Sequence, residues 1–166
     1  MKIHLIFGIW NLSLNIMRIP FKYKDIHNCE AVVLTCIDFR FWRETLEFIE
    51  KELGLASFDF PSLPGSAKAV NECAGDDLAM SCIGVPCDLH HAKKIVIVNH
   101  EDCGAYGGSK KFEGDKDAEQ AFHEMELKKA KDVVLKKYPE KEIVMVYARL
   151  TNEKDAIEFI VIDSAE

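Results

Sequence analysis

Two short polar clusters in this chain combine residue types that bind a soft metal ion. The first covers residues 36–40 (CIDFR) and the second covers residues 100–104 (HEDCG). Two thiolates and one imidazole, here Cys36, Cys103 and His100, form a ligand set that favours zinc over magnesium or calcium. Three protein ligands would leave a fourth coordination position open, as in catalytic zinc sites. The clusters therefore predict a Zn²⁺ site, if the fold brings them together.

The residues that follow Cys36 are suited to act on a water molecule at that open position. In an extended segment, Cys36, Asp38 and Arg40 point to the same side of the chain. Asp38 can then approach the fourth coordination position, and Arg40 can pair with Asp38 and hold its orientation. We therefore predict Asp38 and Arg40 as the catalytic residues. The apolar neighbours expected to wall the site are Ile37, Phe39 and Phe41.

Both clusters follow apolar runs that are typical of buried strands. Residues 31–36 (AVVLTC), 95–99 (IVIVN) and 143–147 (IVMVY) are apolar on both faces, which suits a parallel sheet covered on each side. Residues 157–162 are expected to form a last strand. Ligands of such sheets bind beyond the carboxyl ends of the strands, so the ends of the first two runs would bring both clusters to one edge.

Helical periodicity lies between the apolar runs, over residues 41–53, 76–91 and 115–138. Gly84 and Pro86 are expected to interrupt the second helix. The stripe predicted for the third helix consists of Phe122, Met125, Ala130, Val133 and Val134. Strands that alternate with helices predict an α/β fold, a mostly parallel β-sheet flanked by helices.

Composition narrows the function class. The 166 residues are 48% hydrophobic and 30% charged, and the formal net charge is -7. Such an acidic balance argues against binding to nucleic acid or to an anionic membrane surface. The chain has six cysteines and no convincing secretory signal, and it is large enough to fold without disulfides. We therefore expect a cytoplasmic protein whose cysteines serve metal binding or catalysis.

The first residues do not follow the α/β pattern. Residues 1–19 are rich in apolar side chains, but polar residues interrupt them, so stable membrane insertion is not expected. An arm that packs on a partner subunit, a weak membrane-targeting segment and an upstream extension before Met17 are all compatible with this segment. We therefore divide the chain into an N-terminal arm or extension, 1–27, and a single domain, 28–166.

The two clusters, in this order and each after a strand, resemble the motifs of the β-class carbonic anhydrases. That family carries Cys-x-Asp-x-Arg after its first core strand and His-x-x-Cys-Gly after a later one. The resemblance implies zinc bound by Cys36, His100 and Cys103, and a mostly parallel sheet in a subunit that normally pairs as a dimer. It also implies that Asp38 either accepts a hydrogen bond from zinc-bound water or ligates zinc in a closed resting state. On this basis we expect reversible hydration of CO2 to bicarbonate by a homodimer or higher even oligomer.

The chain also departs from the family pattern. Residues 64–68 (PGSAK) stand where family members usually carry an Arg-Asn-Ala-Gly-like segment, and Ile37 and Phe39 replace the serines that often flank the motif aspartate. Two alternatives therefore stay open. One is a non-catalytic module that binds zinc or a small anion on the same fold. The other is a zinc hydrolase of another small linear substrate, such as carbon disulfide.

The remaining cysteines offer weaker patterns. Cys82, Cys87, His90 and His91 form a rival metal-binding cluster, for which the commoner structure is a solvated helix end whose cysteines pack inward. A thiol redox site is a poor match, because four residues separate Cys82 from Cys87 instead of two. Cys29 and Cys73 have no partner motif and are expected to be structural.

Overall fold

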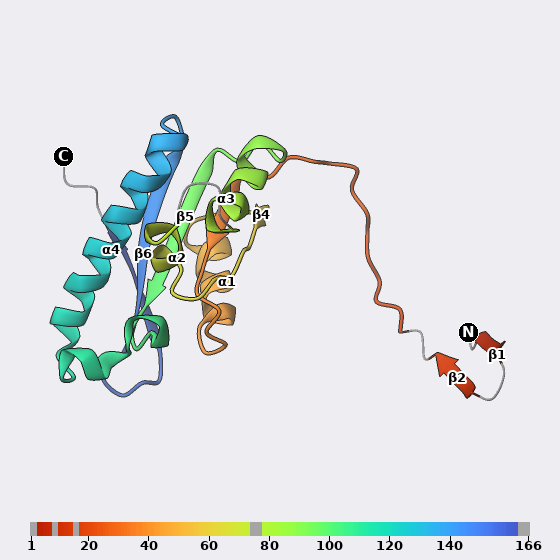
Figure 1. Ribbon diagram of the computed structural model, residues 1–166, viewed down its shortest axis with the longest axis horizontal. Coiled ribbons are helices and arrows are strands. Elements are labelled where there is room, and N and C mark those ends of the chain that lie inside the picture. The colour runs from red at the N-terminus through yellow and green to blue at the C-terminus, as the bar shows by residue number, and fades with distance from the viewer. Residues whose placement is uncertain (1–2, 8–9, 15–16, 74–77, 163–166) are drawn as a thin grey trace.

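The computed structural model describes residues 3–7, 10–14, 17–73 and 78–162. Its N-terminal strands, β1 (Ile3–Phe7) and β2 (Trp10–Leu14), pair with each other in an antiparallel hairpin. Residues 17–28 are exposed and form neither helix nor strand, and Figure 1 shows them as an extended segment leading to the rest of the chain. The assignment of residues 1–27 to an N-terminal arm or extension stays a prediction.

A five-stranded sheet forms the centre of the chain that follows, in the order β4-β3-β5-β6-β7. Neighbouring strands are parallel except for β7, which runs antiparallel to β6. The mostly parallel α/β fold is therefore confirmed, and each predicted apolar run overlaps a strand. The strands are β3 (Ala31–Leu34), β4 (Phe58–Asp59), β5 (Lys94–His100), β6 (Glu142–Leu150) and β7 (Ile157–Ile162).

Helices cover both faces of this sheet, as Figure 1 shows. Because side chains alternate along a strand, Val32 and Leu34 face one layer while Ala31 and Val33 face the other. The first layer contains α2 (Ala67–Asn71), α3 (Leu78–Asp88) and α4 (Lys116–Lys137), and the second contains α1 (Trp42–Lys51). No helix in the described part of the chain is long and apolar enough to cross a membrane.

Two expectations for the helices are wrong. Helix α3 continues through Gly84 and Pro86 instead of being interrupted there. A Cβ atom at Gly84 would lie 2.8 Å from the hydroxyl of Tyr138, so the glycine allows the end of α4 to pack against α3. In α4 the predicted stripe fails at Met125, whose side chain is 57% exposed. The residues of α4 that are buried are Glu119, His123, Leu127, Ala130 and Val134.

Candidate metal centre

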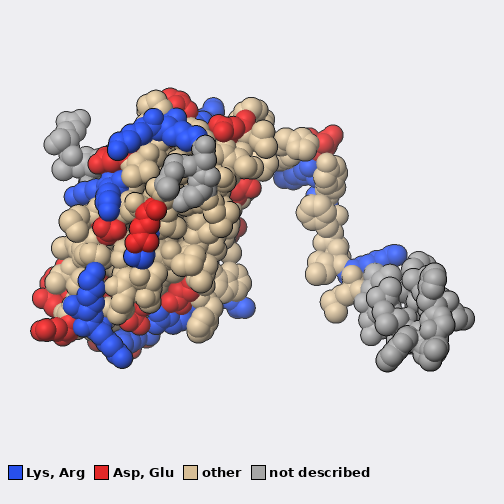
Figure 2. Space-filling view, viewed as in Figure 1, with Lys and Arg blue, Asp and Glu red and all other residues tan. Residues whose placement is uncertain are grey.

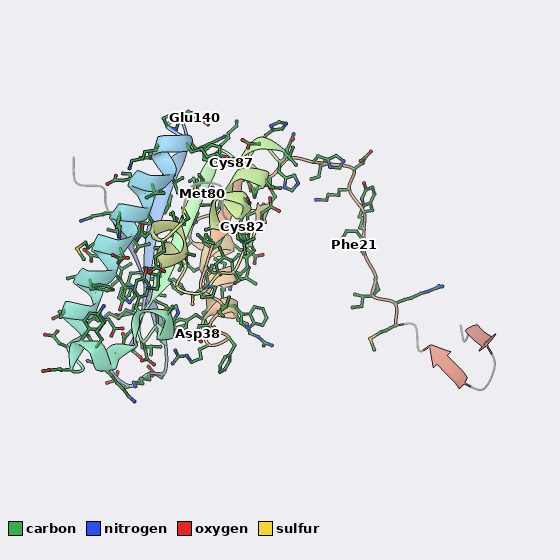
Figure 3. All side chains as sticks on the ribbon, in the orientation of Figure 1. Phe21, Asp38, Met80, Cys82, Cys87 and Glu140 are labelled. Carbon is green, nitrogen blue, oxygen red and sulfur yellow. The ribbon has the colours of Figure 1, made fainter. Side chains whose placement is uncertain are left out.

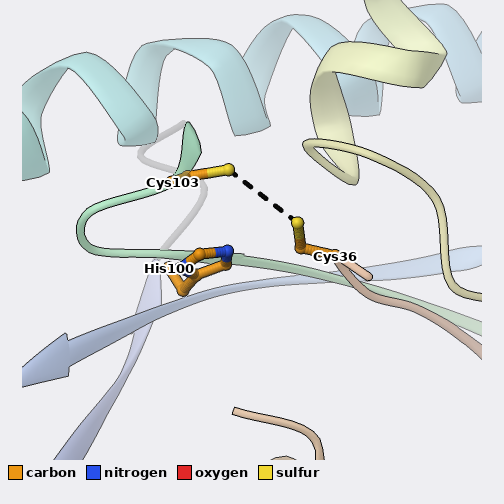
Figure 4. A group of neighbouring side chains, drawn as sticks. All are labelled: Cys36, His100 and Cys103. Atoms are coloured by element: carbon orange, nitrogen blue, oxygen red, sulfur yellow. Dashed lines mark hydrogen bonds between the residues drawn. The ribbon is translucent and has the colours of Figure 1, made fainter. Parts of the chain in front are cut away.

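The three predicted ligands meet at the carboxyl edge of the sheet. Cys36 lies just beyond β3, His100 ends β5, and Cys103 precedes a short 3₁₀ turn, Gly104–Tyr106. Figure 4 shows the two sulfur atoms facing each other beside the imidazole ring, and they are 3.8 Å apart. One ligand atom from each residue lies within 4.8 Å of the others. Because β3 and β5 are parallel neighbours, their ends meet at one edge, as the sequence predicts.

The geometry of this group fits a tetrahedral zinc ion. Two sulfur atoms bound at about 2.3 Å in a tetrahedral site are roughly 3.8 Å apart, which is the observed separation of 3.8 Å. The Nδ1 atom of His100 lies 2.7 Å from the carbonyl oxygen of Glu101, so its N–H donates there and Nε2 keeps its lone pair. That Nε2 is buried without a hydrogen-bond partner. A metal ion at this position would satisfy it.

Cys36 is the more readily ionised thiol of the pair. Its pKa is lowered by the hydrogen bond with Cys103 and further by the backbone N–H of Gly65, which lies 3.3 Å from its sulfur. The same hydrogen bond and burial raise the pKa of Cys103. A bound metal ion would take both sulfurs as thiolates and release the remaining thiol proton.

Gly65 makes its contact with Cys36 from a backbone conformation that suits glycine. Its φ is +74°, and an added Cβ atom would lie 2.9 Å from Cβ of Lys68 and 3.0 Å from Cβ of Ala105. Residues 64–68, where the chain departs from the family pattern, therefore supply a glycine that packs directly against the metal centre. Its role was not predicted.

Asp38 and Arg40 form the predicted pair. Arg40 donates from Nε to Oδ1 of Asp38 at 2.9 Å and from Nη2 to Oδ2 at 2.6 Å. These bonds hold the pKa of Asp38 below its ordinary value, so its carboxylate is ionised. Oδ2 of Asp38 lies 4.0 Å from Nε2 of His100, which places the carboxylate beside the metal ligands.

Arg40 also connects the first cluster to the second. Its Nη1 donates to Oδ2 of Asp102 at 2.9 Å, and its Nη2 donates to the carbonyl oxygen of Asp102 at 3.0 Å. The backbone N–H of Asp102 donates in turn to Glu119 at 2.8 Å, and the Ser109 hydroxyl donates to the other carboxylate oxygen at 2.7 Å. Glu119 is 1% exposed, so this buried carboxylate fixes the loop that carries Cys103.

Sequence reasoning missed Asp102 and Glu119. Asp102 stands inside the second cluster, so its position was a usable signal. Glu119 gave no such signal, because it belongs to a charge-rich helix, and a charge-rich stretch predicts a solvated helix face.

An apolar cavity adjoins the metal ligands. Cys36 and His100 line it together with Phe41 and other residues of α1, β5 and β6. Phe41 is 5% exposed, and its ring lies 4.3 Å from that of His100. Ile37 and Phe39 are 60% and 82% exposed, so only Phe41 of the three predicted wall residues lines the cavity within one chain.

The rival cluster does not assemble. Cys82, Cys87 and His91 belong to no group of neighbouring metal ligands within residues 17–73 and 78–162. Figure 3 shows Cys82 and Cys87 on α3, away from Asp38. Burial raises the pKa of Cys87 to about 11, which leaves it protonated and counts against a reactive thiol pair. His90 lies instead beside Asp59, at 2.6 Å.

The visible face of the molecule carries charged side chains of both signs. Figure 2 shows acidic and basic side chains intermixed over the visible face, with no large basic patch. Nucleic-acid backbones are bound by clustered lysine and arginine residues. This face offers no such surface.

Comparisons with solved structures agree with this architecture. The β-carbonic anhydrase isoform I from Trichomonas vaginalis superposes with a TM-score of 0.55 at 14% identity, over 86% of this chain and 87% of that one. The carbonic anhydrase from Glaciozyma antarctica gives a TM-score of 0.52 at 15% identity, over 84% and 85% of the two chains. The fold is therefore β-carbonic anhydrase-like.

Sequence relatives place the chain in a family. An uncharacterized protein of Rickettsia conorii (strain ATCC VR-613 / Malish 7) is 32% identical over 127 residues, which cover 72% of this chain and 67% of the relative. An uncharacterized protein of Rickettsia bellii (strain RML369-C) is 33% identical over 129 residues, covering 72% and 76%. The family model described as "Putative carbonic anhydrase" matches residues 26–160, a range that contains both clusters. The chain belongs to this carbonic anhydrase family.

Proposed function

We propose that this protein catalyses the zinc-dependent, reversible hydration of CO2 to bicarbonate at Cys36, His100 and Cys103. The observation that carries the proposal is the buried, unpartnered Nε2 of His100 beside two sulfur atoms at the spacing of zinc ligands. Zinc bound there would supply Lewis-acid activation, which makes water a nucleophile near neutral pH. Family membership and the fold of solved carbonic anhydrases support the same function.

Asp38 controls the reacting water in this proposal. An ionised carboxylate is only an acceptor, so it holds the hydrogen of that water and leaves an oxygen lone pair free for the carbon of CO2. Arg40 is a positioning residue, because its bonds to both carboxylate oxygens prevent Asp38 from rotating away. Phe41, whose ring lies against that of His100, offers an uncharged surface to an uncharged substrate. The cavity that it lines has a volume of about 10 Å³, too small to hold CO2 in this conformation of one chain.

A partner subunit would complete the site. Ile37, Phe39 and Trp42 are exposed apolar residues next to the catalytic pair, with exposed fractions of 60%, 82% and 43%. Large apolar side chains gathered at one place mark an interaction surface. We infer that a second copy of the chain covers them in a homodimer or higher even oligomer.

Six free thiols support the cytoplasm as the site of action, because thiols stay reduced there.

A non-catalytic zinc-binding module is the second candidate. The narrow cavity beside His100 and the departure at residues 64–68 favour it. Stopped-flow measurement of CO2 hydration, together with zinc content, separates the two candidates. Hydration that disappears with zinc in Cys103→Ser supports the enzyme, and bound zinc without hydration supports the module. Turnover of carbon disulfide in place of CO2 would identify the hydrolase alternative.

The matched control for that experiment is Cys82→Ser. Cys82 is a half-buried free cysteine on α3 that belongs to no ligand group in the described part of the chain. Its replacement should leave zinc and hydration unchanged. A Cys103→Ser protein that keeps full zinc at this site would contradict the ligand assignment, because a hydroxyl is a poor substitute for a thiolate.

A further inference from the structure

A second group of metal-ligating side chains lies away from the catalytic centre. Cys29 precedes β3, Asp59 ends the short edge strand β4, and His90 follows α3. A sulfur, a carboxylate oxygen and an imidazole nitrogen from these residues lie within 4.8 Å of one another. Nothing in the proposed hydration of CO2 uses these residues.

Backbone hydrogen bonds already hold these three positions together. The N–H of Cys29 donates to the carbonyl oxygen of His90 at 2.9 Å. The N–H of Glu30 donates to the carbonyl oxygen of Ser57 at 2.9 Å, and Asp59 stands opposite Val32 in the parallel pair β3–β4. Segments that are distant in the sequence thus present their side chains to one point before any ligand binds, which lowers the entropic cost of binding.

One distance in the group matches a tetrahedral metal site, and another needs a small side-chain movement. Sγ of Cys29 lies 3.5 Å from Oδ2 of Asp59, and a sulfur and an oxygen bound to tetrahedral zinc are roughly 3.5 Å apart. Nδ1 of His90 lies 2.6 Å from the same oxygen, so these two atoms must separate to roughly 3.3 Å to become ligands. Both side chains are more than a third exposed, at 37% and 36%, and have room for that movement.

The charges also match a divalent cation. A thiolate and a carboxylate supply two negative charges, and a neutral imidazole supplies none, so a divalent ion would leave the site neutral. Sulfur and nitrogen ligands favour zinc over magnesium and calcium. A bound cation would also lie between the Cys29 sulfur and the Asp59 carboxylate, whose atoms approach to 3.5 Å.

We propose that Cys29, Asp59 and His90 bind a second zinc ion, which fastens β4 and the start of the domain to the end of α3. Strand β4 has two residues and pairs with β3 at two positions, so it gains little from the sheet alone. Residues 17–28, just before Cys29, are exposed throughout. A cation at this place would fix the edge of the sheet where the exposed segment enters the domain.

A zinc titration against a chromophoric chelator tests this site in the full chain. We expect wild-type protein to bind one zinc tightly and a second more weakly, because the second site is more exposed. Cys29→Ser and His90→Gln should each weaken the second event at least about tenfold while the first is unchanged. Cys103→Ser should lose the first event and keep the second, so failure at one centre is distinguishable from failure at the other.

Two matched controls and a second readout complete the design. Cys82→Ser and His91→Gln replace neighbouring residues of the same types outside the group, and both should bind two zinc ions. Added zinc should raise the melting temperature of wild type beyond the value reached with the first equivalent, and His90→Gln should lose this increment. His90 is half-exposed, so His90→Gln should fold even if Cys29→Ser does not. Binding of a single zinc by wild type, or a second zinc that neither variant weakens, would overturn the proposal.

Discussion

Replacing Asp38 by asparagine isolates the control of the reacting water from the binding of metal. The amide has the size and shape of the carboxylate, but it has no charge and carries donors on one of its two polar atoms. Oδ2 of Asp38 accepts a 2.6 Å bond from Arg40 and lies 4.0 Å from Nε2 of His100. Both carboxylate oxygens accept from Arg40, so the NH2 group of asparagine faces a donor of Arg40 in either orientation, and at the position of Oδ2 it also cannot accept the hydrogen of the reacting water.

The expected loss follows from what a positioned proton acceptor contributes. Such groups accelerate reactions by roughly 10²–10⁴-fold, and the Asp38 side chain is only 16% exposed, so solvent replaces it poorly. We expect CO2 hydration near pH 8 to fall at least about tenfold, a loss of at least roughly 1.4 kcal/mol of transition-state stabilisation. Zinc content should stay at the wild-type level, because Cys36, His100 and Cys103 are intact.

Stopped-flow hydration between about pH 6.5 and 9, with zinc measured on the same samples, provides the assay. Asp102→Asn is the matched control, because it removes the other acidic partner of Arg40. The Asp102 side chain is 44% exposed, and we expect a smaller loss of CO2 hydration in this variant. A fall in Asp38→Asn that is smaller at low pH than at high pH would identify Asp38 as a zinc ligand of a closed resting state. Wild-type hydration across this range with zinc retained would refute a catalytic role for Asp38.

Further variants test the surroundings of the site. Gly54 follows α1 with a φ of +66°, and an added Cβ atom would meet nothing within 4 Å, so Gly54→Ala should cost only about 1–2 kcal/mol of unfolding free energy. Gly65→Ala should cost roughly 1–3 kcal/mol more, because its added Cβ atom would clash; equal melting temperatures would contradict this packing. The pKa of Asp102 is lowered from 3.8 by its arginine partner. The ionised Asp102 carboxylate therefore contributes fully to the free energy of unfolding above that value, and this contribution is lost as pH falls through the folded-state pKa. Without metal, Asp102→Asn should consequently lose less unfolding free energy than wild type when the pH is lowered. Light scattering should give the mass of at least two chains, and Phe39→Glu should reduce it; a single-chain mass for wild type would exclude the dimer.

The edge of the sheet that carries the candidate site was predictable, because the local pattern and a topological rule agree there. Cys36 and His100 each end an apolar run, and parallel strands place their carboxyl ends together. The contact between Arg40 and Asp102 was not predictable in this way. It depends on the path of the loop after β5, which the buried carboxylate of Glu119 fixes through hydrogen bonds.

Other predictions failed because tertiary packing overrode the structural preference of the local sequence. Met125 has the spacing of a core residue, yet it is exposed because His123 and Glu119 occupy the inner face of α4. Pro86 was expected to break its helix, but α3 accommodates it in its last turn. Strand β4 has only two residues and no apolar run, so the proximity of Asp59 to Cys29 and His90 left no sign in the sequence.

The pairing of β3 with β5 has a kinetic consequence. Cys36 and Cys103 are 67 residues apart in the chain, and α1, β4, α2, α3 and β5 lie between them in the sequence. Contacts of such long sequence separation form slowly, because the loop entropy is lost before the pairing stabilises the chain. We therefore expect a metal ion that needs both cysteines to bind after the rate-limiting step. It should slow unfolding without accelerating folding, so bound zinc would lengthen the lifetime of the native state.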